Sequence, residues 1–231
     1  AMADRNLYRF VRYGETSANY EFEDASKSED IQMAYVVNFP FKVNLIDLNG
    51  FMRRLFGERE MNGVTKLNNG YLTMVAASAQ DEQISANVEA IAQYAAYCRA
   101  LGIRVLYVQP PYKISKYDPQ LPAGVYDGHN ASLNMLVDRL QQKGVEILDL
   151  REQMHADGVN PYDLFYKTDH HWTTEGGFYA YQKIAERIAS DTGTTVDPKL
   201  LDMENYQIDN YPRWHLGSRG QRTGILFAGI D

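Results

Sequence analysis

The sequence predicts one α/β domain built on a mainly parallel β-sheet. Two observations carry this prediction: short β-rich runs alternate with helical runs from about residue 71 onward, and a glycine follows most of the helical runs. A length of 231 residues with 45% apolar residues suffices for one substantial core but is short for two ordinary domains. We therefore expect an N-terminal extension over residues 1–44 and the α/β domain over residues 45–231.

The N-terminal part is predicted to hold one short helix. Residues 13–30 are acidic and poor in aliphatic side chains, so they are expected to form an extended arm or a loop without a core. Apolar residues recur at helical spacing over residues 45–56, and Gly57 follows them. This pattern predicts a helix that leads into the domain.

The core is predicted to alternate strand and helix three times. The predicted strands are residues 71–76, 103–108 and 145–150, and the predicted helices are residues 84–101, a segment from about residue 131 to Gly144, and the segment from Trp172 to Ile188. In such sheets ligands bind beyond the carboxyl ends of the strands. The loops of residues 110–117 and 166–174 are therefore the expected location of the functional site.

Composition excludes some functions. The net charge of −7, without a Lys/Arg-rich stretch, argues against binding of nucleic acid. The single cysteine, Cys98, lies on an apolar helical stripe and is expected to be a buried, inert thiol. No apolar run reaches the length of a membrane span, so the chain is expected to be soluble, with any membrane anchor lying outside it.

Asp169, His170, His171 and Trp172 form the densest group of reactive side chains in the sequence. A carboxylate two residues before a histidine can accept a hydrogen bond from its Nδ1–H, which leaves Nε2 free as a base. Thr173 or Thr174 could cap the helix that follows and hold the group in place. The alternative is a capped turn whose histidines make ordinary hydrogen bonds.

The segment 166–185 resembles the Asp-x-His-Trp block of the alginate O-acetyltransferase-like branch of the SGNH (GDSL-like) hydrolase superfamily. It is still more similar to the bacterial family named for its Asp-His-His-Trp (DHHW) signature. The resemblance continues through residues 62–64, 69–72, 110–113 and 217–224. It implies a three-layer α/β/α flavodoxin-like SGNH-hydrolase fold, a serine nucleophile, and esterase or O-acyltransferase activity, often on cell-envelope carbohydrate. The implied ligand is a carbohydrate or acylated small molecule, without cofactor or metal, and the implied location is extracellular or in the cell envelope.

The same resemblance assigns roles to individual residues. Asp169 matches the orienting carboxylate and His171 the base, because the family pattern is Asp-x-His. His170 occupies the variable position, where it contacts substrate or packs. Trp172 is either a wall of the substrate cleft or a core aromatic.

Two residues of the Pro110-Pro111 loop are further candidates for substrate binding, namely Tyr112 and Lys113. Lys113 follows two prolines at a strand end, where its ammonium could enter the cleft and meet an anionic group. The alternative is a solvated loop lysine.

The nucleophile is the point at which this sequence departs from the family pattern. Related enzymes carry their serine after the histidine block, in a strand-turn-helix segment, and the chain stops just after what reads as an incoming strand at residues 225–228. We therefore expect a truncated chain whose serine lies beyond its end. Ser218 is a weaker candidate because no β-run leads into it, and Ser78, which follows a predicted strand but lacks flanking glycines, reads as a cap or loop serine.

Two other classes of function stay open. Asp169-His170-His171 is also the signature of metal-dependent phosphoesterases, but Asp149, His129 and His155 form no second ligand motif. A non-catalytic glycan-binding or envelope-assembly protein could also keep the fold and the histidine block without the serine.

Overall fold

Two small sheets organise the described residues, which are 39–211 and 215–229 of a computed structural model. The antiparallel sheet contains β1 (Glu60–Met61), β2 (Val64–Lys66) and β3 (Leu72–Thr73), and the parallel sheet contains β4 (Leu106–Gln109) and β5 (Glu146–Asp149). The helices are α3 (Lys42–Leu55), α4 (Asp81–Ala100), α5 (His129–Gln142), α6 (Leu150–Ala156), α7 (Thr174–Thr192), α8 (Ser218–Thr223) and α9 (Ile225–Ala228), with 3-10 turns η2 (Pro161–Leu164), η3 (Pro198–Leu201) and η4 (Met203–Asn205). The predicted arm over residues 13–30 lies outside the described residues.

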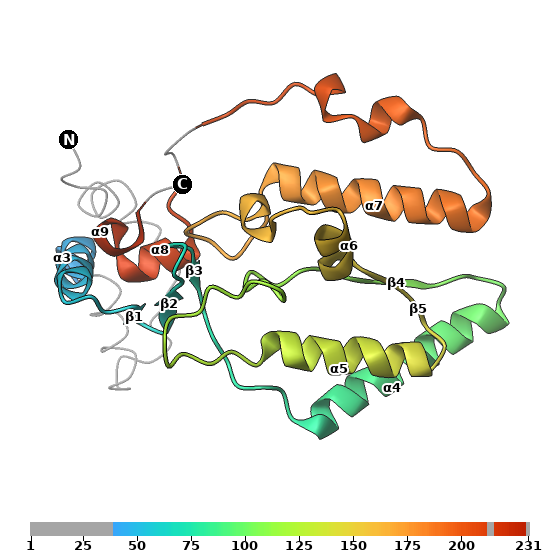
Figure 1. Cartoon of the computed structure of the whole chain (residues 1–231), viewed down its shortest axis with the longest axis horizontal. Helices are drawn as coiled ribbons and strands as arrows, with labels where there is room; N and C mark the ends of the chain where they lie inside the picture. The colour runs from blue at the N-terminus through green and yellow to red at the C-terminus, as the bar shows by residue number, and fades with distance from the viewer. Residues whose placement is uncertain (1–38, 212–214, 230–231) are drawn as a thin grey trace, which may run out of the picture.

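The parallel sheet forms the middle of three layers (Figure 1). β4 and β5 pair in register from Leu106 opposite Glu146 to Gln109 opposite Asp149. Alternate side chains point to opposite faces of a strand. Tyr107 and Ile147 accordingly pack with α4 and α5 on one face, whereas Leu106, Val108 and Leu148 pack with Ala180 and Ile184 of α7 on the other. The predicted three-layer α/β arrangement with parallel strands in the middle is confirmed.

The first predicted strand differs most from the prediction. Only Leu72 and Thr73 of residues 71–76 form a strand, and they pair antiparallel with β2 rather than joining β4 and β5. The reason is that later backbone groups bind side chains instead of a neighbouring strand. The Met74 carbonyl accepts a hydrogen bond from the Tyr112 hydroxyl, and the Ala76 N–H donates to Asp127 at 3.2 Å.

The predicted strand at residues 225–228 is a helical turn, α9, and the prediction was wrong here. Gly224 has a φ of 78°, so the chain turns sharply just before α9. The Ile225 N–H then donates to Oδ1 of Asp47 at 2.7 Å, which ties the start of α9 to α3. Gly50 of α3 allows this close approach, because a Cβ there would lie 2.4 Å from the Thr223 carbonyl oxygen.

The long helices follow the predicted pattern. α4, α5 and α7 coincide with the three predicted amphipathic segments, and Cys98 on α4 is buried, as predicted. α7 ends at Gly193, whose φ of 68° is the left-handed conformation typical of a helix end. Among the helices of the described residues, none is both long and apolar enough to cross a membrane.

Candidate active site

The Asp169 loop is a short hairpin that the sequence closes at both of its ends. Phe165 and Trp172 form an isolated antiparallel bridge, and the Tyr166 N–H donates to the His171 carbonyl at 3.2 Å. Thr173 then caps α7, since its Oγ1 accepts a hydrogen bond from the Gly176 N–H at 3.2 Å. The predicted cap is therefore present, and it holds the hairpin against a long helix.

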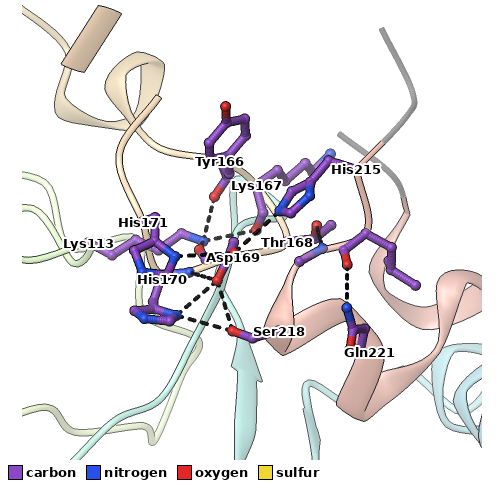
Figure 2. Close-up of polar contacts among 12 residues, drawn as sticks. Lys113, Tyr166, Lys167, Thr168, Asp169, His170, His171, His215, Ser218 and Gln221 are labelled. Carbon is purple, nitrogen blue, oxygen red and sulfur yellow. Dashed lines mark hydrogen bonds and ion pairs between the residues drawn. The ribbon is translucent and has the colours of Figure 1, made fainter. Parts of the chain in front are cut away.

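Asp169 is the centre of the site (Figure 2), and its carboxylate is almost fully buried. Oδ1 accepts hydrogen bonds from the Ser218 hydroxyl at 2.8 Å and from the His170 backbone N–H at 2.7 Å. Oδ2 lies 3.3 Å from Nδ1 of His171 and 3.3 Å from Nε2 of His215. The carboxylate is thus surrounded by donors from the hairpin and from the start of α8.

These donors determine the charge of Asp169. Burial on its own raises the pKa of this carboxyl, but the hydrogen bonds from Ser218, the His170 N–H, His171 and His215 together lower the pKa well below its usual range. Asp169 is therefore ionised at neutral pH and can orient an imidazole and stabilise its protonated form.

His171 has the geometry of a base. Its Nδ1 faces Asp169, its side chain is 67% exposed, and none of the described residues gives its Nε2 a hydrogen bond. The hydrogen bond between Asp169 and His171 that the spacing predicts is therefore present. The imidazole ring of His171, whose Nε2 has no partner in the part of the chain that the structure describes, is thus exposed to solvent.

His170 and Ser218 are differently arranged. Nδ1 of His170 lies 2.8 Å from Oδ1 of Asp169 and 3.1 Å from the Ser218 hydroxyl oxygen, so one nitrogen faces both groups. A relay needs one imidazole nitrogen for the carboxylate and the other for the nucleophile. Ser218, the first residue of α8, donates its proton directly to Asp169 and acts here as a support for that carboxylate.

The approach of α8 to Asp169 depends on a glycine. A Cβ on Gly217 would lie 2.3 Å from Cβ of Asp169, so only glycine fits there. The Gly217 N–H donates to Oγ1 of Thr168 at 2.9 Å, and the Thr168 carbonyl accepts from the N–H groups of Arg219 and Gly220. These contacts hold Ser218 and His215 within hydrogen-bond distance of the Asp169 carboxylate.

Lys113 is placed differently from both sequence-based alternatives. It is only 3% exposed, and its ammonium donates to the carbonyl oxygens of Tyr166 at 2.7 Å, of Lys167 at 3.0 Å, and of Asp169 (Figure 2). It is neither a solvated loop lysine nor open to a cleft. Lys113 instead binds three backbone carbonyls of the hairpin.

Tyr112 and Trp172, the other predicted substrate contacts, both make internal contacts. The Tyr112 hydroxyl donates to the Met74 carbonyl, and its ring stacks on His129 with centroids 4.1 Å apart. Trp172 packs on the core cluster beneath α7 and meets Phe165 edge to face. Ser78 lies in an exposed loop, where its hydroxyl is 3.1 Å from that of Tyr126.

The cluster also has the composition of a metal site. One ligand atom each of Asp169, His170 and His171 can lie within 4.8 Å of one another. A second such group, which a paired-metal centre requires, does not occur among residues 39–211 and 215–229.

His215 was missed by the sequence analysis. It lies 46 positions from Asp169, and no spacing rule connects the two. The neighbouring Gly217–Gly224 segment, which belongs to the family resemblance, was the only signal near it.

The fold and the site together define an SGNH-hydrolase-like α/β domain with an Asp-x-His pair on a loop beyond the parallel strands. Residues 71–211, more than half of the chain, match the family described as the SGNH hydrolase-like domain of the acetyltransferase AlgX, and the chain belongs to that family. The matched residues include Asp169, His170 and His171 and exclude Ser218.

Two solved structures are also similar, both of PatB1 from Bacillus cereus, one of them with a sulfonyl adduct. Sequence identity is 22% and 21%, the TM-score is 0.49 for each, and 56% and 57% of this chain is covered. The chain spans 43% and 45% of those two chains, which is less than half of their length. Curated protein sequences gave no match.

Proposed function

We propose that this domain carries the acid–base half of an SGNH-type O-acyl transfer site, with His171 as general base and Asp169 as its orienting carboxylate. One observation carries the proposal: Nδ1 of His171 faces an ionised, buried carboxylate while Nε2 faces solvent without a partner among the described residues. The family to which the chain belongs includes an acetyltransferase, which supports acyl transfer rather than phosphoryl chemistry.

The proposed chemistry proceeds in two displacements. A serine hydroxyl attacks the carbonyl carbon of an acyl donor while Nε2 of His171 takes the hydroxyl proton. The bond from the acyl carbon to the donor oxygen breaks, and His171 returns the proton to that oxygen. Water or an acceptor hydroxyl then attacks the acyl-serine by the same steps, which gives hydrolysis or transfer. Asp169 stabilises the imidazolium in both displacements.

The serine in this proposal approaches Nε2 of His171 from outside the described residues. Ser218 is not assigned this role, because its hydroxyl donates to Asp169 and faces Nδ1 of His170. The acyl acceptor in the proposal is a carbohydrate of the cell envelope. The resemblance of residues 166–185 to the alginate O-acetyltransferase-like branch supports this choice, and the exposed side chain of His171 is accessible to a large acceptor.

The test is an acetyl-ester hydrolysis and acetyl-transfer assay on the intact protein that carries this domain. His171→Ala should lower kcat/KM by several orders of magnitude, and Asp169→Asn by up to about 10⁴-fold. His170→Ala is the matched control, since it removes the neighbouring imidazole, and it should lower the rate far less.

Two outcomes would contradict the proposal. Equal losses in His170→Ala and His171→Ala would favour metal ligation by the whole Asp169–His171 group. A complete lack of turnover together with specific glycan binding would favour the non-catalytic, glycan-binding alternative.

A further inference from the structure

A small pocket lies beside the carboxyl ends of the two parallel strands and involves none of the proposed acid–base residues. Its volume is about 40 Å³, and Tyr112, Ser115, Lys116, Tyr117, Arg151 and His155 are among the residues that line it. Arg151 follows the end of β5 by two positions, and the other strand, β4, leads into the loop of residues 111–117. Open α/β sheets bind ligands at this edge.

Arg151, which lines this pocket, has one N–H group without a partner in the described part of the chain. Its side chain is 4% exposed, with Nε 3.0 Å from Oδ1 and Nη2 2.6 Å from Oδ2 of Asp149. Nη1 is buried and has no hydrogen-bond partner among the described residues. Leaving a buried charged donor unsatisfied is costly, so an acceptor that reaches Nη1 would be favoured.

The donor groups around the pocket favour an oxyanion as that acceptor. The lining contains a guanidinium, the Lys116 ammonium and the His155 imidazole but no carboxylate, although the whole chain carries a net charge of −7. Two acidic residues beside the lining are already bound: Asp149 to Arg151, and Glu152 to Lys116 and the Tyr117 hydroxyl. The rings of Tyr117 and His155, which both line the pocket, stack with their centroids 3.7 Å apart and so hold each other in place.

We propose that this pocket binds a small oxyanion, the carboxylate or phosphate group of a ligand, with one oxygen accepting hydrogen bonds from Nη1 of Arg151. Lys116, which is ion-paired with Glu152, supplies further N–H donors at the pocket. The pocket is small, which suits an anionic group of a few atoms. The site is separate from the proposed acyl-transfer chemistry and stands without it.

The test is a titration of the purified chain with sodium acetate and, separately, with sodium phosphate, followed by NMR at constant ionic strength against sodium chloride. Saturable shifts near Arg151 with at least one of the two anions are expected, and the preferred anion identifies the group. Arg151→Lys keeps the positive charge beside Asp149 but removes Nη1, so it should weaken binding by about ten- to a hundredfold.

Arg187→Lys is the matched control. Arg187 on α7 is also ion-paired, with Nε 2.7 Å from Asp191, but it does not line the pocket, so its replacement should leave the affinity unchanged. If Arg151→Lys does not fold, Lys116→Gln takes its place and should weaken binding several-fold. The proposal is overturned if neither anion binds saturably, or if the affinity is the same in these pocket variants as in Arg187→Lys.

Discussion

The Lys113 ammonium donates a hydrogen bond to the backbone carbonyl of Asp169 across 56 positions of the chain. The lysine belongs to the loop after β4, and the aspartate to the hairpin before α7. The same ammonium also binds the carbonyls of Tyr166 and Lys167, so one buried cation binds three backbone carbonyls of the hairpin.

Replacing Lys113 with Met should therefore destabilise the domain. The variant keeps most of the apolar stem but leaves three carbonyls without their charged donor, and the expected cost is about 2–4 kcal/mol. Urea unfolding followed by circular dichroism measures it. Lys143→Met is the control, because Lys143 forms an exposed ion pair with Glu89 and should change stability by less than about 1 kcal/mol. Equal effects of the two replacements would contradict the buried role of Lys113.

Two glycine-to-alanine replacements should have opposite signs. Gly217→Ala puts a methyl group 2.3 Å from Cβ of Asp169, so α8 or the hairpin must shift, and the expected loss is about 1–3 kcal/mol. Gly177→Ala on α7 meets no atom within 4 Å and should stabilise the domain by about 0.5–1 kcal/mol, because alanine favours the helix. Thermal unfolding of both variants checks this. A neutral Gly217→Ala would show that the close packing of α8 on Asp169 is absent in solution.

The stability that Asp169 contributes should depend on pH. Its pKa is lower in the folded state than in the unfolded state, so its contribution is present above the unfolded pKa, about 3.9, and is lost as the pH falls through the folded value. At neutral pH, Asp169→Asn should be less stable than the natural chain, and the gap should narrow below about pH 4. Urea midpoints of both proteins measured across this range test the sign. A gap that stays constant on acidification would mean that the carboxylate is not selectively stabilised.

Ser218→Ala should affect stability more than turnover. Its hydroxyl donates to a buried carboxylate, and losing that hydrogen bond should cost about 1.5–3 kcal/mol. We expect the 231-residue chain to hydrolyse p-nitrophenyl acetate weakly or not at all, and Ser218→Ala to leave any such activity in place. Ser78→Ala, in a loop hydrogen-bonded to Tyr126, is the control for both measurements. Clear hydrolysis that disappears in Ser218→Ala would identify Ser218 as the nucleophile.

Much of the three-layer arrangement could be predicted from the sequence. α4, α5 and α7 each repeat apolar residues over several turns and end near a glycine. β4 ends at the Pro110-Pro111 loop, whereas β5 runs directly into α6. Residues 225–228 show the limit of this reasoning. A four-residue apolar run has no period that separates strand from helix, and α9 is set instead by Gly224 and by Asp47 in a distant helix.

The residues of the candidate site could likewise be predicted only in part from the sequence. Asp169 and His171 are two positions apart, so local spacing was enough to pair them. His215 and Ser218 reach the same carboxylate only because α8 folds back across 46 and 49 positions. The buried positions of Lys113 and Arg151 likewise depend on tertiary packing, since a long cationic side chain carries no sequence signal for which carbonyl or carboxylate it will meet.

A backbone hydrogen bond joins the antiparallel sheet to the hairpin, from the Leu72 N–H to the Lys167 carbonyl at 2.9 Å. Leu72 is fully buried, so its amide proton exchanges with solvent only when this junction opens. The exchange rate of that single proton therefore reports how often the Asp169 hairpin detaches from the body of the domain. Ligands or replacements that loosen the hairpin should accelerate it, even when global unfolding is unchanged.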